Sequence, residues 1–341
     1  MANIYDVAKR ARVSVSTVSA VVNETAYVSR ALRSRVREAI EVLGYRPNLL
    51  ARSLAKQKSH MIGMIVPDIA NPFWPEVVRG AEDKAHQSGY TLLLSNSDDD
   101  PEKEALYLNL FLAKRVDGIL MAKAPGRLNA QLAAQIRAAK TPIALMVRVS
   151  KAMACDTVVL DDRDSAYEAV SHLLRVGYQR IAIVNGLETV SSSQHRLAGY
   201  KKALKDWGRP YVPALIYHGN FRVESGYLGG LDLLKQKPDA VFITNYLMAV
   251  GFMRALRQYQ LRCPDDVAIV TCDDHPWLES FAPGLTTVDF PKHELGRESC
   301  RVLIDRLAQP GRALQSVELK SALTIRESCG FQARRGATAI A

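Results

Sequence analysis

Small polar side chains crowd a short stretch near the start of this 341-residue chain. Hydroxyl and amide groups of this kind bond to phosphate oxygens and to the edges of nucleic-acid bases. We expect phosphate or base-edge contacts from four of them, Ser14, Thr17, Ser19 and Asn23. Three neighbours are expected to face the bases, and two later residues to meet the next stretch of nucleic-acid backbone: Val15, Ser16 and Ala20, then Tyr27 and Ser29.

Three consecutive helical patterns must position these side chains. Their apolar residues recur at helical spacing, as Val7, Ala8 and Ala11, then Val15, Val18, Val21 and Val22, then Leu32, Val36, Ala39, Ile40 and Leu43. Short polar residues that can accept helix N–H groups mark the three starts: Asn3 with Asp6, Ser14 and Ser29. Because only a short turn separates the first two helices, they must cross sharply, as in a helix-turn-helix that presents its second helix to a major groove.

Charge supports a nucleic-acid role independently of this pattern. Residues 1–60 hold 11 Lys and Arg against 4 Asp and Glu, a net of +7, whereas the remaining residues hold 34 against 31, a net of +3. Most of the formal charge of +10 therefore belongs to a small head, as in modules that neutralise phosphates. The alternative is a solvated three-helix bundle that merely happens to be basic.

Length and composition limit the remaining possibilities. A hydrophobic content of 48% suffices for large cores in a chain longer than one ordinary domain. No apolar run could span a bilayer and no signal-peptide segment precedes the first helix, so we expect a cytoplasmic protein with no membrane partner. The five cysteines lack CxxC spacing and are odd in number, which favours reduced thiols over disulfides or a metal site.

Beyond Ser59 the pattern changes to alternating strands and helices. Helical patterns around residues 77–87, 102–113 and 128–139 separate the first apolar runs, and a second series follows. The runs are Ile62–Val66, Thr91–Leu94, Gly118–Met121, Ile143–Val147, Val158–Leu160, Ile181–Val184, Leu215–Tyr217, Ala240–Ile243, Val267–Val270 and Leu285–Val288. Such runs predict parallel sheets covered on both faces, in two lobes.

Motifs of catalysis are missing from these lobes. The sequence has no GxGxxG after a strand, no GxxxxGK[ST], no HExxH and no GxSxG, so we expect no enzyme activity and no cofactor. The histidines are too dispersed for a metal cluster, and we interpret Asp98, Asp99 and Asp100 as a solvated acidic loop. Parallel α/β lobes nonetheless bind ligands at the carboxyl ends of their strands, so a small-molecule site there is the default expectation.

Motifs along nearly the whole chain resemble the lactose/purine repressor family (LacI/GalR type). They are IYDVAKRA, VSxSTVSxVVN and LGYRPNxLARSLA in the head, and IGMIVPDIANPF, VDGIL, the stretch from His195 to Tyr200, the pair Asp273-Asp274 and LTTVDFP in the body. The resemblance implies a small all-α helix-turn-helix head plus a hinge helix. A two-lobed α/β effector domain with parallel sheets, like a periplasmic sugar-binding protein, would follow.

The resemblance and the patterns together set the expected domain limits. These are a helix-turn-helix DNA-binding domain at 1–46, a hinge helix at 47–58, an effector-binding and dimerisation domain at 59–332 and a flexible tail at 333–341. Lobe 1 is expected at about 60–158 and 290–318, and lobe 2 at about 159–289 and 319–332. The tail has no leucine-rich heptads, so we expect a homodimer without a tetramerising coil.

The hinge is predicted to fold only on specific DNA, because isolated helices shorter than roughly 12 residues are marginal in water. By resemblance, two copies would pack in the minor groove with Leu54 as an apolar wedge between base steps. Asn48 and Ala51 complete the expected hinge contacts. The alternative is an ordinary linker with incidental leucines.

Seven residues of the body are the candidate effector site: Phe73, Lys123, Arg148, Arg196, Phe221, Asn245 and Asp273. By resemblance, Phe73 flanks the ligand ring, Phe221 stacks on it and Arg196 clamps it. Asn245 matches the asparagine of the family's usual Asn-Asp pair, and Asp273 matches the aspartate that binds ligand hydroxyls. The two phenylalanines could equally be core aromatics, whereas an arginine and an aspartate are costly to bury without partners.

Departures from the family pattern bear on the ligand. Tyr246 replaces a common aspartate, and Val147 stands where many members have an aspartate before Arg148. Lys123 falls at the end of its strand, so the ligand-facing charge is expected to be more positive than in members that bind neutral sugars. We therefore expect a sugar or, more specifically, a sugar acid or phosphorylated sugar as effector. The alternative is that Lys123 and Arg148 point to solvent or to acidic side chains.

Two departures lie in the head. Ala20 stands where most members have an arginine, the commonest reader of guanine, so the facing base pair is predicted to be degenerate or to prefer thymine. Arg12 stands where the turn usually has glycine, which implies backbone strain if that turn needs a positive φ.

These observations predict a ligand-controlled transcription regulator, most simply a repressor, that binds pseudo-palindromic DNA as a homodimer. One rival is a sugar-binding receptor without a regulatory role, which would need a signal peptide and has no use for the basic head. The other is a doubly wound enzyme, which the missing catalytic motifs disfavour. The effector, its sign of action and the operator stay open.

Overall fold

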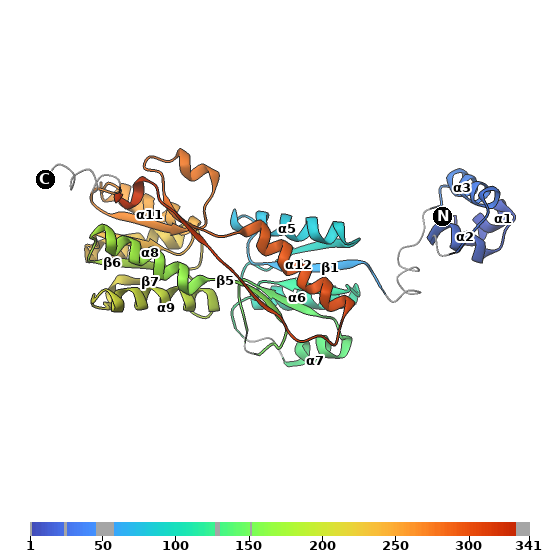
Figure 1. Cartoon of the computed structure of the whole chain (residues 1–341), viewed down its shortest axis with the longest axis horizontal. Helices are drawn as coiled ribbons and strands as arrows, with labels where there is room; N and C mark the ends of the chain where they lie inside the picture. The colour runs from blue at the N-terminus through green and yellow to red at the C-terminus, as the bar shows by residue number, and fades with distance from the viewer. Residues whose placement is uncertain (1, 24–25, 46–57, 127–129, 151, 332–341) are drawn as a thin grey trace. The chain divides into compact units, whose positions relative to one another are not determined.

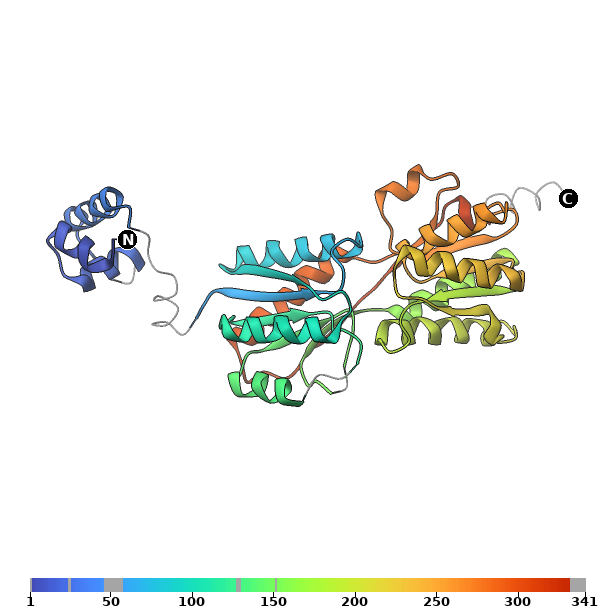
Figure 2. The ribbon, with the colours of Figure 1, turned by 180° about the vertical axis from the view of Figure 1, so that it is seen from behind.

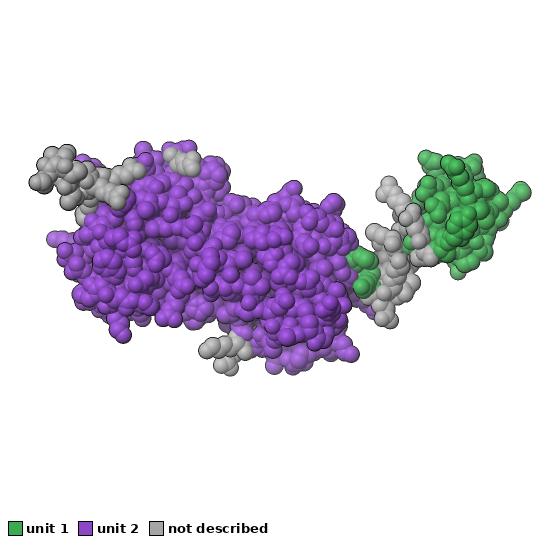
Figure 3. All heavy atoms as spheres, in the orientation of Figure 1, with its two compact units in different colours: residues 1–60 green, residues 61–341 purple. Residues whose placement is uncertain are grey.

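The computed structural model describes residues 2–23, 26–45, 58–126, 130–150 and 152–331. It divides into two compact units, residues 1–60 and 61–341, which we call the head and the body (Figure 3). All five cysteines are free thiols. Among the helices described, none is both long and apolar enough to cross a membrane.

The described residues of the head form three helices, α1 (Ile4–Ala11), α2 (Val15–Asn23) and α3 (Arg30–Leu43). α1 begins with the predicted reciprocal cap, because the Asn3 side chain accepts the Asp6 N–H at 3.1 Å and the Asp6 carboxylate accepts the Asn3 N–H at 2.9 Å. Val7, Val18 and Val36, one from each helix, are fully buried in the head core. The helical spacing of the apolar residues is therefore confirmed.

The first lobe of the body surrounds a six-stranded sheet with the order β11-β5-β4-β3-β1-β2. Its strands are parallel: β1 (Met61–Val66), β2 (Thr91–Asn96), β3 (Gly118–Met121), β4 (Ile143–Met146), β5 (Asp156–Leu160) and β11 (Ser316–Leu319). Its helices are α5 (Phe73–Gln87), α6 (Pro101–Ala113), α7 (Ala130–Ala139) and α12 (Lys292–Ala308). Neighbouring residues of β3 pack into two different clusters, Leu120 with α5 and α12, Ile119 with α6 and α7. Both faces of the central strands are therefore covered, whereas β2 at the edge is partly exposed.

The second lobe surrounds another six-stranded sheet, with the order β12-β10-β9-β8-β6-β7. Its strands are β6 (Ile181–Asn185), β7 (Ile216–His218), β8 (Ala240–Ile243), β9 (Ala268–Cys272), β10 (Thr286–Asp289) and β12 (Ala322–Thr324). Its α-helices are α8 (Asp162–Val176), α9 (Ser191–Asp206), α10 (Val223–Leu233) and α11 (Tyr246–Gln258), and short 3-10 turns lie at Pro213–Leu215, Leu234–Gln236, Pro276–Ser280 and Glu327–Cys329. β12 runs antiparallel to β10, and the other strand pairs are parallel.

Within the described residues the chain passes between the lobes three times, after β5, after β10 and after β11 (Figures 1 and 2). The first passage follows Leu160, two residues beyond the expected limit at 158, because β5 stays paired with β11 up to the partners Leu160 and Leu319. Neither β11 nor β12 was predicted, since their short sequences SVEL and ALT hold few apolar residues.

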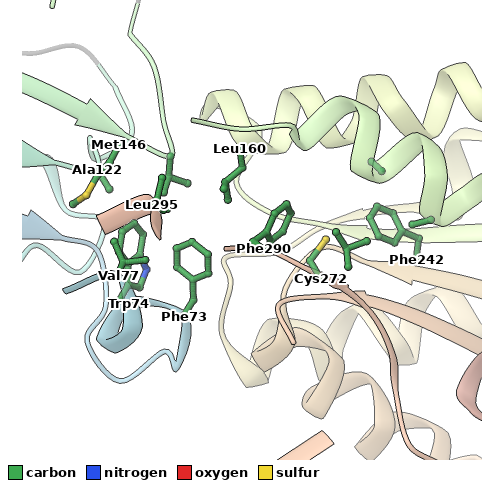
Figure 4. Close-up of a cluster of buried hydrophobic side chains, with 14 of the residues drawn as sticks. Phe73, Trp74, Val77, Ala122, Met146, Leu160, Phe242, Cys272, Phe290 and Leu295 are labelled. Atoms are coloured by element: carbon green, nitrogen blue, oxygen red, sulfur yellow. The ribbon is translucent and has the colours of Figure 1, made fainter. Parts of the chain in front are cut away.

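A hydrophobic cluster lies where the lobes meet (Figure 4). It joins Trp74 of α5 to Phe290, which follows β10, and to Cys272 of β9. Behind it, α5 and α12 pack so closely that a Cβ at Gly80 would lie 1.9 Å from the carbonyl oxygen of His293. This tight contact holds α5 and α12 of the first lobe against each other.

Candidate functional site

α2 begins at a cluster of hydroxyl groups. The Ser14 side chain accepts the Thr17 N–H at 3.1 Å, so Ser14 is the predicted helix cap. Its hydroxyl also lies 2.7 Å from the Ser16 hydroxyl and 2.8 Å from the Thr17 hydroxyl. The three side chains thus form one exposed polar group at the start of the helix, with lone pairs and O–H groups left for a ligand.

Four of the predicted reading residues lie on the side of α2 away from the head core, where Ser16 is exposed and the other three are half-buried. Ser16, Ser19, Ala20 and Asn23 follow the spacing i, i+3, i+4 and i+7, which places them on one face of the helix. The Asn23 amide donates to the Ser19 carbonyl oxygen at 2.9 Å and to its hydroxyl at 3.2 Å. Val15 was predicted to face bases, but it is half-buried and packs against the head core.

The turn before α2 is strained. Arg12 adopts φ 51° and ψ 51°, the left-handed conformation that glycine would reach without steric cost. The Arg35 guanidinium of α3 donates to the carbonyl oxygens of Ala11 and Arg12, the latter at 3.2 Å. Arg35 therefore ties the turn to α3 and holds the angle at which α2 leaves α1.

A cationic surface lies beyond α2, at the start of α3. The Tyr27 side chain is 94% exposed, and Ser29 is exposed without the side-chain capping bond that its position predicted. Both flank a shallow groove, lined by Tyr27, Val28, Arg30, Arg33, Ser34 and Arg37. The three arginines were not among the predicted contacts, although their spacing along one face of α3 is visible in the sequence.

Three predicted DNA contacts, Asn48, Ala51 and Leu54, lie outside the described residues, as does most of the expected hinge helix at 47–58. The hinge therefore stays a prediction.

The body contains a cavity of about 50 Å³ between its lobes. Six of the seven predicted effector residues line it: Phe73 and Arg148 from the first lobe, and Arg196, Phe221, Asn245 and Asp273 from the second. Most of these residues sit at or just beyond the carboxyl ends of the strands, where parallel sheets present their ligands.

Lys123 does not line this cavity. Its ammonium group donates to the carbonyl oxygens of Ala124 and Gly126 at 2.9 and 2.8 Å and lies 3.6 Å from the buried Glu104 carboxylate. Burial raises the pKa of Glu104, although the Ala124 N–H and Lys123 oppose that rise. The prediction that Lys123 faces the ligand was wrong, because an acid on α6 that is 19 residues away in sequence pairs with it.

The acidic loop at Asp98 to Asp100 is also not simply solvated. Asp99 lines the cavity, and both of its carboxylate oxygens accept bonds from the Arg148 guanidinium, one of them at 3.3 Å. Asp98 pairs with Lys103, and the Asp100 side chain caps α6. The solvated-loop interpretation was therefore wrong for Asp99, whose charge balances that of Arg148.

Arg148 also reaches across the cleft. Its guanidinium lies 5.6 Å from the ring centroid of Phe221 in the second lobe, within the range of a cation–π contact. Beside it, the Val149 N–H donates to the Ser191 hydroxyl at 2.9 Å. These two contacts join the lobes along one edge of the cavity.

Arg196 is held by a similar pairing inside the second lobe. Its Nε donates to the buried Asp162 carboxylate at 2.8 Å, and its Nη1 donates to the Thr244 carbonyl oxygen at 2.5 Å. Burial alone would lower the pKa of Arg196, but the Asp162 and Asp273 charges and the hydrogen bond to Asp162 act together to hold the pKa above its ordinary value. The guanidinium also lies 5.2 Å from the Phe290 ring centroid, so its plane is fixed before any ligand arrives.

Asn245 and Asp273 are two further polar residues of the second lobe that line the cavity. The Asn245 amide donates to the Asp273 carboxylate at 3.0 Å, while its oxygen caps α11 by accepting the Met248 N–H at 3.3 Å. Burial raises the pKa of Asp273, although the nearby Arg196 and Lys292 charges favour its ionised form. The carboxylate accepts this amide bond and has oxygen lone pairs left to accept a further hydrogen bond from a ligand.

Backbone strain gathers at this cavity. Val147, Phe221 and Asp273 all line it and all have positive φ, 65°, 63° and 73° respectively. Such conformations cost about 1–3 kcal/mol each in non-glycine residues and cluster at ligand sites. For the β-branched Val147 the value is a true outlier, so the loops around the cavity are held by their surroundings.

The lining groups suit a ligand rich in hydroxyls. Three arginines and three aspartates line the cavity, so the formal charges balance: Arg148, Arg196 and Arg222 against Asp68, Asp99 and Asp273. Paired cations and carboxylates offer donors and acceptors side by side, as a hydroxyl group requires. In the part of the chain that the structure describes, no cluster of His, Cys, Asp and Glu could hold a metal ion.

Both parts of the chain are similar to known proteins. A model described as "Bacterial regulatory proteins, lacI family" matches residues 3–48, and one described as "Periplasmic binding protein-like domain" matches residues 170–329. A ribose operon repressor of Halalkalibacterium halodurans is 35% identical over 336 residues, covering 96% of this chain and 97% of the relative.

Two solved structures are similar along almost the whole chain. The lac repressor dimer bound to operator and the anti-inducer ONPF has a TM-score of 0.84 at 29% identity, over 96% of this chain and 99% of that one. The complex of the transcriptional regulator CelR with cellobiose has a TM-score of 0.71 at 29% identity, over 96% and 100%.

Proposed function

The chain belongs to the lacI family of bacterial regulatory proteins and is a DNA-binding transcription regulator, and on this premise we propose that it is a repressor controlled by a neutral sugar or similar polyol. The ligand would bind in the cavity between the lobes and change the affinity of the protein for its operator. A regulator of this kind works in the cytoplasm, where bacterial DNA lies.

The balanced charge of the cavity carries the choice of a neutral ligand. An acidic effector was expected because three cations seemed free to meet it, but Lys123, Arg148 and Arg196 each have a carboxylate partner. A ligand carboxylate would have to compete with Asp99 for Arg148, beside the further charge of Asp273. The names of two similar proteins, a ribose operon repressor and a regulator bound to cellobiose, agree with a sugar.

The size of the cavity supports ligand control. At about 50 Å³ it is far smaller than the roughly 300–1,000 Å³ of ordinary ligand pockets. A sugar can enter only if the lobes or the loops bearing Arg148 and Phe221 move, so the ligand binds a different arrangement from this one. Such differential binding is what lets a ligand shift a conformational equilibrium.

On DNA we propose a homodimer that reads a pseudo-palindromic operator through α2. A two-fold protein places the same helix in two equivalent half-sites, and the similar lac repressor is a dimer in its structure with operator. Ser14, Ser16, Thr17, Ser19 and Ala20 would approach the bases and phosphates. Tyr27, Ser29 and the arginine groove of α3 would meet the next phosphates.

A two-part experiment tests the proposal. Mobility-shift assays with selected operator DNA should show specific binding by the full chain, and a neutral sugar that raises its melting temperature should change that binding. Asp273→Asn keeps the shape of the side chain but removes the charged acceptor, so it should lose the sugar response and keep DNA binding. Asp232→Asn, an exposed acid of the same lobe outside the cavity, is the matched control.

Stabilisation by sugar acids alone would contradict the neutral effector. A chain that binds sugar but shows no preference for any DNA would favour the rival receptor without a regulatory role.

A further inference from the structure

The first lobe contains a second pocket, of about 590 Å³, that is separate from the cavity between the lobes. It lies where α7 ends and where β4 and β5 begin. Because β4 and β5 are parallel, their starts share the edge of the sheet opposite to the one that bears Arg148. The two pockets therefore occupy opposite ends of the same sheet.

The wall of this pocket is mainly apolar. It is lined by Ile136 of α7, Ile143 of β4, Met153 of the loop before β5, and Leu314, whose side chain is 55% exposed. The volume falls within the range of small-molecule sites, unlike that of the cavity between the lobes. An apolar surface that is hollowed in this way can bury the body of an apolar ligand.

Two cations stand at the rim without acidic partners. Arg137 and Lys140 are exposed, and neither makes an ion pair with any residue that the structure describes. The other arginine of the pocket, Arg306, differs, because its guanidinium donates to both Asp156 oxygens at 2.9 and 3.0 Å and to backbone carbonyl oxygens. Asp156 is thereby neutralised, and the free charge at the pocket is positive.

We propose that this pocket binds an amphipathic carboxylate, such as a medium-chain fatty acid or an aromatic acid, as a second ligand of the protein. The apolar body of the ligand lies against Ile136, Ile143 and Leu314, and its single anionic group meets Arg137 and Lys140 at the rim. A sugar fits poorly, because its hydroxyl groups would be buried against carbon without hydrogen-bond partners.

Titration calorimetry of the full chain with decanoate, naphthoate and decanol tests the ligand class. We expect saturable binding of one carboxylate per chain and binding of decanol that is a few-fold weaker, since each exposed ion pair contributes little. A preference for decanoate or for naphthoate separates a chain-like ligand from a ring. Absence of saturable carboxylate binding, or equal affinity for decanol, overturns the proposal.

Cys155 reports where the ligand binds. It lines this pocket, is half-buried, and burial raises its pKa to about 11, so it reacts slowly enough to follow at alkaline pH. Decanoate should slow alkylation of Cys155, measured by mass spectrometry, and leave Cys263 of the second lobe unaffected. Binding that leaves Cys155 unprotected places the ligand elsewhere and overturns the proposal.

Two variants test the contacts without touching the core. Leu314→Asp places a negative charge in the pocket lining, where it repels the carboxylate of the ligand. Arg137→Glu replaces one of the two cations by a negative charge. Both variants should weaken decanoate binding at least several-fold. Lys114→Glu, an exposed cation of the same lobe outside the pocket, should leave binding unchanged. A second copy of the chain could instead cover the pocket. The proposal fails if the wild-type protein does not bind decanoate and sedimentation shows that it self-associates whereas Leu314→Asp does not.

Discussion

Replacing Ala20 by arginine should create a guanine preference at one operator position. Ala20 is half-buried on the face of α2 that carries Ser16, one turn after that residue, while Val18 and Val21 lie in the head core. Its methyl group can contact a thymine methyl but offers no hydrogen bond, so the wild-type protein should tolerate several bases there or prefer thymine.

The size of the effect follows from geometry. An arginine fork bonded to the O6 and N7 of guanine contributes about 1–3 kcal/mol of discrimination against other bases. At about 1.4 kcal/mol per factor of ten, this corresponds to roughly a 5- to 150-fold preference for guanine at the facing position. Other positions of the site should keep their preferences, because no other reading side chain moves.

Selection of sites from random DNA, followed by competition binding at fixed salt, measures this preference for both proteins. Ala26→Arg is the matched control, since it adds the same charge at an exposed position beyond the end of α2. The control should strengthen binding to all sequences and steepen the salt dependence without a new base preference. A wild-type protein that already demands guanine, or an Ala20→Arg variant with unchanged sites, would refute the placement of α2 in the major groove.

Three further substitutions test the energetics of the fold and the site. Arg12→Gly should stabilise the head by about 1 kcal/mol, because glycine adopts φ 51° without steric cost; slower amide exchange in the head measures it. Asp156→Asn should lower the free energy of unfolding by about 3 kcal/mol, measured by urea titration, because Arg306 and Arg312 lose the buried carboxylate that both of them contact. Gly186→Ala should strengthen sugar binding by roughly a few-fold, since a Cβ there would lie 2.0 Å from the Phe221 ring and displaces that ring from the Arg148 contact that joins the lobes, which favours the arrangement that admits the ligand.

Each of these has a control. Arg10→Gly, inside α1, should destabilise the head. If Arg12→Gly also destabilises it, the inferred backbone strain at Arg12 is wrong. Burial alone would raise the pKa of Asp156, but its arginine partners hold the pKa below its usual value. The contribution of Asp156 is thus complete at neutral pH and shrinks as pH falls through about 4, so a constant difference between wild type and Asp156→Asn would contradict the ion pair. Gly311→Ala, with open space around it, should leave sugar binding unchanged.

Local signals explain most of what the sequence could predict. The Asn3 cap and the helical spacing of valines are encoded within a few residues, so the head was predictable helix by helix. Runs such as Gly118–Met121 and Ala240–Ile243 are strands with the predicted limits, because a strand buried on both faces is apolar throughout. β11 and β12 were not predicted because they are short, partly exposed and contribute little to the core.

The charge state of the site was not predictable in this way. Arg148 and Asp99 are 49 residues apart, and Arg196 and Asp162 are 34 apart, so only the packing of the folded lobes brings each pair together. Family resemblance placed six of the seven body residues around one cavity, because strand ends converge there. It could not show that Arg148, Arg196 and Lys123 each had a carboxylate partner, and the expectation of an acidic ligand depended on treating these cations as free.

The most direct test of the central claim is a single titration. Full-length protein is titrated with its selected operator and with a scrambled duplex, each with and without the neutral sugar that most raises its melting temperature. We predict a strong preference for the operator, and a change of operator affinity with the sugar that exceeds any change for the scrambled duplex. Equal affinity for the two duplexes, or operator binding that the sugar leaves unchanged, would contradict ligand-controlled recognition of DNA by this protein.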